Sequence, residues 1–125
     1  MANKNKIKGN TFERKIISEI NGLHLGYLVG SSRLHSRYMD NMDVDIVDHP
    51  LSEIKFPYHI QNKSITGYPK YHDIFSEFKL TDKPLIVFHE LTEKRGSRFF
   101  KLNDYVIMKK EDFYEILKKL KNVER

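Results

Sequence analysis

The spacing of hydrophobic residues predicts helices near the N-terminus, in the middle and at the C-terminus of the chain. Apolar residues three or four positions apart share one face of a helix, and this spacing recurs in all three parts. The first helix is expected to begin at Asn10, with Asn10 and Glu13 forming a capping box, and to end at Asn21-Gly22. The middle helix is expected over residues 70–78. The apolar positions expected to face inward are Phe12, Ile16, Ile17, Ile20, Tyr71, Ile74, Phe75, Phe78, Phe113, Ile116, Leu117 and Leu120.

Between these helices, shorter segments alternate apolar and polar residues or form a continuous apolar run, which predicts strands. Residues 30–42 are expected to form a Gly/Ser/Arg loop, and residues 90–97 a charged loop or hairpin tip. The expected strands are Tyr27–Val29, Val44–Val47, Tyr58–Lys63, Pro84–Phe88, Arg98–Leu102 and Tyr105–Met108. This order predicts an α/β or α+β fold, with a single mixed sheet flanked by helices in one domain over residues 1–125. Residues 1–8 are expected to be a mobile basic arm.

Composition adds a bias in charge and indicates a compartment. The chain has 125 residues, no cysteine and a formal net charge of +5. Without cysteine there is no disulfide and no thiolate zinc site, which fits a reducing cytoplasm. No apolar run approaches the ~20 residues that span a bilayer, and no signal peptide is expected. The basic charge favours a polyanionic partner through phosphate contacts, although the same charge also keeps a small protein in solution.

Glu13 is the first candidate for chemistry because it lies inside the apolar stripe of the first helix. A buried carboxylate is costly unless it is paired, hydrogen-bonded or bound to a metal. The capping box offers a purely local explanation for the same glutamate. The sequence leaves both explanations open.

Two of the expected strands carry polar residues on one face. Asp43 and Asp45 would share one side of a strand, and Gln61 and Lys63 one side of the next. The short connection between these strands allows an antiparallel pairing that sets Asp45 beside Gln61 and Lys63. Each pair alone is also typical of a solvated strand face. Together with Glu13, however, they bring carboxylates, an amide oxygen and an ammonium to one end of the sheet.

This combination of groups is what metal-assisted phosphodiester cleavage requires. Asp45, the side-chain oxygen of Gln61 and the backbone carbonyl of Asn62 would hold Mg²⁺, which polarises the scissile phosphate and acidifies a water. Lys63 would orient that water or stabilise the charge that develops on the phosphate. Glu13 would hold a second metal or a metal-bound water.

Three segments, Lys8–Arg14, Asp45–Val47 and Ile60–Lys63, resemble the motifs of the PD-(D/E)XK nuclease superfamily, and within it archaeal-type and phage Holliday-junction resolvases. The resemblance implies a restriction-endonuclease-like core, and it favours Asp45 over Asp43 as the metal ligand. It implies Mg²⁺ as the cofactor, with Mn²⁺ able to substitute. It also implies a homodimer that cuts two strands of a four-way DNA junction and leaves 5′-phosphates, in the cytoplasm of a bacterial, archaeal or phage-infected cell. The active site implied by the resemblance is Glu13, Asp45, Gln61 and Lys63.

Gln61 departs from the family pattern, in which a glutamate usually stands at this position. The change removes one negative charge and weakens metal affinity on electrostatic grounds, leaving more of the ligation to Asp45, Glu13 and Asp43. Restriction-type members with Gln-X-Lys resemble this arrangement. Two alternative functions stay open: a restriction- or repair-type endonuclease on the same fold, and a non-catalytic nucleic-acid-binding module.

Basic and hydroxyl side chains outside this site are candidates for DNA contacts. Arginine forks suit phosphates, and serine hydroxyls add short contacts. The segment 94–98 is explained equally well as a charged hairpin turn. The candidates are Arg14, Ser31, Ser32, Arg33, Arg37, Lys94 and Arg95.

Overall fold

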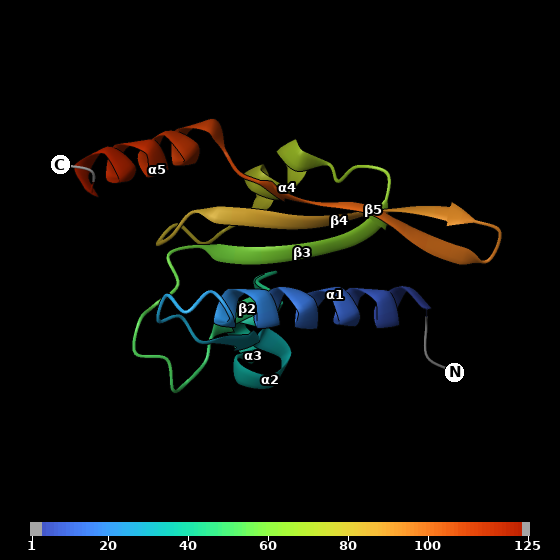
Figure 1. Cartoon of the computed structure of the whole chain (residues 1–125), viewed down its shortest axis with the longest axis horizontal. Helices are drawn as coiled ribbons and strands as arrows, with labels where there is room; N and C mark the ends of the chain where they lie inside the picture. Colours follow the sequence, from blue (N-terminus) through green and yellow to red (C-terminus); the bar gives the residue numbers. More distant parts are fainter. Residues whose placement is uncertain (1–3, 124–125) are drawn as a thin grey trace.

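The computed structural model describes the backbone of residues 4–123 and the side chains of residues 8–123 (Figure 1). Its elements follow in the order α1 (Lys4–Asn21), β1 (Val29–Ser31), α2 (Ser32–His35), α3 (Arg37–Asn41), β2 (Ile46–Asp48), β3 (His59–Thr66), α4 (Tyr71–Glu77), β4 (Leu85–Arg95), β5 (Arg98–Ile107) and α5 (Lys110–Val123).

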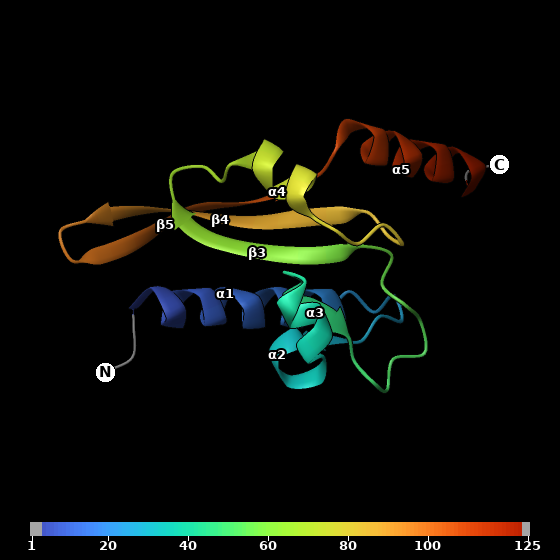
Figure 2. The same ribbon diagram turned by 180° about the vertical axis from the view of Figure 1, so that it is seen from behind.

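The strands form one five-stranded mixed sheet in the order β1-β2-β3-β4-β5. β3 and β4 run parallel and are connected through α4, whereas the other neighbouring pairs are antiparallel. α1 covers one face of the sheet, and α4 lies on the other (Figures 1 and 2). The expected α+β architecture, a single mixed sheet flanked by helices, is therefore confirmed.

The main core lies between α1 and the sheet. Apolar side chains four residues apart on α1 pack against buried strand residues, as an amphipathic helix does. Ile60 and Ile86 pair in register within this core, so their neighbour Gln61 faces the side of the sheet on which α4 lies. The buried members of the core are Phe12, Ile16, Ile20, Val29, Ile46, Ile60 and Ile86.

α1 begins earlier than the sequence pattern predicts. The helix is already formed at Lys4, so Asn10 lies in its interior, and the predicted start with its capping box is wrong. The lysine-rich segment before Asn10 contains no proline and consists largely of residues that tolerate a helix, so nothing stops the helix there. Residues 4–8 are helical rather than a mobile arm, and residues 1–3 of that predicted arm lie outside the described residues.

The segment 30–42 is not a loop but contains two short helices. β1 is displaced along the chain to Val29–Ser31, and α2 and α3 follow it directly. The Ser31 hydroxyl accepts a hydrogen bond from the N–H of Arg33 at 3.2 Å and so caps α2. Ser36 caps α3 in the same way. The serines that suggest a flexible loop therefore act as helix N-caps.

The two aspartates after α3 do not share a strand face. Asp43 lies in a turn with a φ of 63°, and β2 begins only at Ile46. Asp45 precedes the strand by one residue. The prediction that Asp43 and Asp45 project from one side of a strand is therefore wrong.

The two strands expected at residues 98–108 are one strand, β5. It forms a long hairpin with β4, which extends to Arg95, so the turn consists only of Gly96-Ser97. Leu91 pairs with Asn103 and Thr92 with Lys101, which leaves the intervening Leu102 as a bulge. The bulge explains why the polar and apolar positions change phase in the middle of β5.

α5 extends beyond the end of the sheet (Figure 1), and its apolar stripe does not face inward as predicted. Phe113, Leu117 and Leu120 are 48%, 46% and 54% exposed. Helical periodicity predicts that a face is apolar, but it does not specify what covers that face.

Among the described residues, no helix is long and apolar enough to span a membrane.

Candidate functional site

Asp45 lies between α3 and β2, at the edge of the sheet where β2 stops pairing with β3. Its N–H donates to the carbonyl of Ile60 at 2.8 Å, and its carbonyl accepts from the N–H of Ser32 at 2.9 Å. Its Oδ2 accepts a hydrogen bond from the N–H of Asn62 at 2.7 Å. The side chain thus takes the place of a neighbouring strand and is held directly beside β3.

Glu13 reaches the site from α1. The residue is 7% exposed, and its Oε1 lies 3.2 Å from Nη2 of Arg33 on α2. Because α1 starts at Lys4, Glu13 cannot serve as part of an N-terminal capping box. Of the two explanations that the sequence leaves open, the structure supports a buried carboxylate paired with an arginine.

The carboxyl group of Asp45 has a pKa of about 6, well above the ordinary value of 3.8. Burial is the largest cause, and the hydrogen bond from Asn62 acts in the opposite direction. The charges of Glu13 and Asp40 raise this pKa further, whereas the ammonium of Lys63 lowers it. Three charged side chains therefore lie within electrostatic reach of one carboxylate, with an excess of negative charge that a cation would relieve.

Gln61 and Lys63 project from β3 on the face opposite α1. Both line a hollow of about 260 Å³ between the end of α3, β3 and α4. Gln61 is 6% exposed. Asp43 lines the same hollow from the turn after α3, although it is itself exposed.

Asn62 contributes its backbone N–H to the site. Its N–H is held by Asp45, as described above. Both polar atoms of its side-chain amide are buried and have no hydrogen-bond partner within the described part of the chain. The backbone carbonyl expected as a ligand belongs to β3, which pairs with β4 at this position.

The oxygen atoms of Asp45, Glu13 and Gln61 are of the chemical type that a hard divalent cation prefers. Mg²⁺ prefers carboxylate, amide and carbonyl oxygens, and Asp45, Glu13 and Gln61 provide such donors. In residues 8–123, no group of three or more His, Cys, Asp or Glu side chains is arranged to hold a metal. A metal site here therefore requires the amide oxygen of Gln61 as an additional ligand.

The candidate DNA contacts separate into buried and exposed residues. The Ser31 hydroxyl caps α2, and the Ser32 hydroxyl donates to Asp40 at 3.2 Å. Both serines are buried, so neither faces the surface that a phosphate path would need. The exposed candidates are Arg14, Arg33, Arg37, Lys94 and Arg95.

Asp40 and His89 lie close to the site, although no sequence pattern points to them. Asp40 projects from α3, a helix that the serine-rich segment does not predict. His89 pairs in register with Lys63, is 1% exposed, and has an Nε2 without a hydrogen-bond partner among the described residues. Only the strand register brings His89 next to Lys63, and a single sequence does not specify that register.

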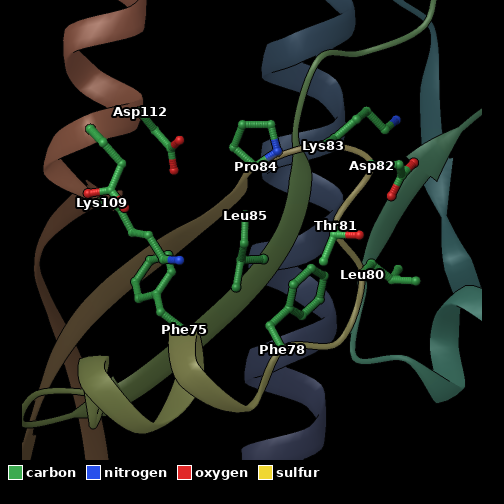
Figure 3. Close-up of a pocket in the computed structure, with 11 residues that line it drawn as sticks. Phe75, Phe78, Leu80, Thr81, Asp82, Lys83, Pro84, Leu85, Lys109 and Asp112 are labelled. Atoms are coloured by element: carbon green, nitrogen blue, oxygen red, sulfur yellow. The ribbon is translucent and has the colours of Figure 1, made fainter.

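A second hollow, of about 340 Å³, lies between α4, the loop before β4 and the start of α5 (Figure 3). Phe75, Phe78 and Leu85 form its apolar wall, and Lys109 and Asp112 lie at its α5 side. It contains none of the expected site residues, although Phe78 also lines the hollow that contains Gln61 and Lys63.

Comparisons with protein-family profiles, with curated proteins and with solved structures found no match for this chain.

Proposed function

We propose that this protein is a magnesium-dependent endodeoxyribonuclease with a PD-(D/E)XK-type active site, and that it resolves Holliday junctions. The observation that carries the proposal is the position of Asp45. Its carboxylate is within electrostatic reach of Glu13 and Lys63. The β2–β3 register, in which Ile46 pairs with Ile60, sets it across from Gln61. Asp45 at the strand edge thus adjoins Glu13 from the α1 side of the sheet and Gln61 and Lys63 from the other, and carboxylates, an amide oxygen and an ammonium are the groups that phosphodiester hydrolysis uses.

Each side chain has a role in this proposal. Mg²⁺ held by Asp45, Gln61 and Glu13 would polarise the scissile phosphate and acidify the attacking water. Lys63 would orient the water and offset the charge that develops on the phosphate. Arg33 keeps Glu13 in place through their 3.2 Å contact. Asp45 would hold the cation as a carboxylate, since a metal ligand must be deprotonated.

The presence of Gln61 favours one second candidate function, a DNA-binding module without cleavage. An amide oxygen carries no net charge, so the site has one negative charge fewer than a site with glutamate. A lower affinity for Mg²⁺ follows from Coulomb's law. Catalysis at millimolar Mg²⁺ and binding without catalysis are both compatible with that weaker affinity.

The proposed substrate is DNA because the chain carries a formal charge of +5 and presents several exposed arginines and lysines. The proposed active form is a homodimer in a reducing cytoplasm. A second copy of the chain would cover the apolar face of α5, whose leucines are about half exposed. Two active sites in one particle would cut the two opposing strands of a junction.

The test is an endonuclease assay on a labelled four-way junction and on linear duplex DNA, each with Mg²⁺ and with EDTA. Paired nicks near the branch point that require Mg²⁺ and carry 5′-phosphates support the proposal. Lys63→Ala should abolish these nicks, whereas Lys70→Ala, an exposed lysine outside the site, should leave them unchanged. Cutting of linear duplex at a fixed sequence indicates a restriction- or repair-type enzyme. Junction binding without any cut, at every Mg²⁺ concentration, indicates the binding module.

A further inference from the structure

The end of the β4–β5 hairpin extends beyond the rest of the sheet (Figures 1 and 2). β3 ends at Thr66, which pairs with Thr92 on β4. Beyond this point β4 and β5 pair only with each other, from Glu93 opposite Phe100 to the turn. We call residues 93–100 the ribbon.

The ribbon is strongly basic. It contains three basic residues, Lys94, Arg95 and Arg98, and all of them are exposed. Its one acidic residue, Glu93, is engaged with Arg95 at 2.7 Å. A local excess of exposed cations on a protruding element is the pattern expected of a surface that binds a polyanion.

Aromatic rings lie beside two of these cations, Lys94 and Arg95, and beside Lys8 of α1. Lys8 of α1 lies 4.0 Å from the centre of the Phe99 ring, and Lys94 lies 5.9 Å from the same ring. Arg95 lies 4.8 Å from the centre of the Phe100 ring. Such stacking limits the rotamers of long basic side chains, so less entropy is lost when they bind phosphate.

α1 supports the base of the ribbon. The ammonium of Lys8 donates a hydrogen bond to Thr92 at 3.1 Å and, at the same time, lies over Phe99 on β5. Burial lowers the pKa of Lys8, and the nearby charge of Glu90 raises it. Lys8 therefore positions the ribbon against the body of the protein rather than presenting a free charge.

The register of the sheet gives the distance between the ribbon and the proposed active site. Lys63 pairs with His89, and Arg95 follows six residues later on β4. An even number of residues keeps Arg95 on the same side of β4 as His89, and the bulged residue lies on β5. At roughly 3.3 Å per residue the separation is about 20 Å, which matches about six base pairs of B-form DNA.

We infer that the ribbon is a phosphate-binding arm, which contacts duplex DNA about six base pairs away from the scissile phosphate. The distance rests on the proposed function, because it is measured from Lys63. The ribbon itself is assigned from its own charge, stacking and exposure. It contacts the backbone and not the bases, so it adds affinity without sequence preference.

The experiment measures DNA binding in EDTA, so that cleavage does not enter, for the wild-type chain and two matched variants. Arg95→Gln with Arg98→Gln removes two charges from the ribbon. Lys118→Gln with Lys119→Gln removes two charges from the exposed face of α5. Thermal melting of each variant verifies that it is folded.

The ribbon variant should bind a junction with long arms about tenfold or more weakly, because charge-assisted contacts contribute on that scale. The slope of the logarithm of the DNA association constant against the logarithm of the salt concentration is negative. Its magnitude should decrease by about two, one for each lost phosphate contact. The α5 variant should show neither effect. A junction with arms of about four base pairs ends before it reaches the ribbon. The wild type should therefore bind this short-armed junction about as weakly as the ribbon variant binds the long-armed one.

Equal affinities of the two variants would overturn the ribbon assignment and leave the proposed nuclease intact. If the affinity for DNA depends on the ribbon but the protein never cuts DNA, the proposed nuclease activity is overturned and the ribbon assignment stands. An affinity that depends on the ribbon but not on arm length would refute the spacing. A wild-type chain that binds no DNA would overturn both proposals.

Discussion

Asp45 accepts a hydrogen bond from the backbone N–H of Asn62 at 2.7 Å, and through it a carboxylate replaces a strand neighbour at the edge of β3. β2 pairs with β3 only through Ile46 and Ile60, so the N–H of Asn62 would otherwise lack this partner. The contact holds the carboxylate within electrostatic reach of Glu13 and Lys63. The cost is a buried acidic group whose pKa is raised to about 6.

Replacement of Asp45 by asparagine should stabilise the metal-free protein at alkaline pH. The pKa in the folded state, about 6, is above the ordinary 3.8, so folding favours the protonated carboxyl group. The stability that Asp45 contributes is complete below pH 4 and is lost as the pH rises through 6. The full difference corresponds to about 3 kcal/mol. Urea unfolding in EDTA should therefore give Asp45→Asn a higher free energy of unfolding at pH 8 and an equal one at pH 4.

The other titrating groups are common to both proteins and cancel in this comparison. The same substitution should abolish cleavage, so one variant would gain stability and lose activity. A wild type and a variant with the same pH dependence of stability would show that Asp45 is not a buried, charged group in the folded protein.

Replacement of Gln61 by glutamate should increase the affinity for Mg²⁺. An additional carboxylate close to a divalent cation strengthens binding at least about tenfold, even when the effective dielectric constant is high. The Mg²⁺ concentration for half-maximal cleavage should fall accordingly, and calorimetric titration of the protein with Mg²⁺ should show the same change. Without metal, the third acid should destabilise the fold above neutral pH.

Gln61→Ala serves as the control for this prediction, since it removes the oxygen without adding charge. Its half-maximal Mg²⁺ concentration should rise. If Glu, Gln and Ala at this position give the same Mg²⁺ dependence, residue 61 is not a metal ligand.

Replacement of Arg33 by alanine should destabilise the protein by about 1 kcal/mol, because it leaves the buried carboxylate of Glu13 without its cation. The arginine is about half exposed, so solvent reduces the effect below that of a fully buried pair. In the Glu13→Gln background the same substitution should cost much less. A double-mutant cycle by urea unfolding measures the difference, and a coupling energy near zero would mean that the pair contributes nothing.

The parts of this structure that the sequence predicts are those encoded by local periodicity. The stripe of Phe12, Ile16 and Ile20 specifies the core face of α1, and strand alternation places Gln61 and Lys63 on one face of β3. Asp45 was expected on a strand face and instead reaches the same place by bonding to the edge of β3. Such edge contacts depend on where β2 stops, which is a tertiary property.

The start of α1 and the environment of α5 illustrate two further limits. Asn10 carries a correct N-cap signal, but the lysine-rich residues before it also favour a helix, and an internal asparagine is only mildly unfavourable. For α5, the apolar stripe is present, and yet the sheet ends before it can cover that stripe. Periodicity reports which residues avoid water, whereas the length of the sheet decides whether the chain itself shields them.

Asn10→Ala distinguishes a helix interior from a helix cap. In the interior of α1, alanine should stabilise the protein by a few tenths of a kcal/mol, since asparagine has the lower helix propensity. At an N-cap the same change would cost about 1 kcal/mol. Urea unfolding therefore gives opposite signs for the two positions, and a loss of stability would contradict a helix that begins at Lys4.

The apolar face of α5 should hold two copies of the chain together. Phe113, Leu117 and Leu120 are each about half exposed on this helix, which is costly in a monomer and useful at an interface. Sedimentation of the wild type should show a dimer whose population rises with concentration. Leu117→Glu should shift it to monomer, because a charge at the centre of an apolar contact is desolvated without a partner.

Asn122→Glu adds the same charge to the same helix at an exposed polar position and should leave the dimer intact. With the junction substrate, the monomeric variant should still nick single strands slowly but should lose the pairing of its nicks. A wild type that sediments as a monomer at every concentration, or a Leu117→Glu protein that remains dimeric, would show that another surface or no second copy is used.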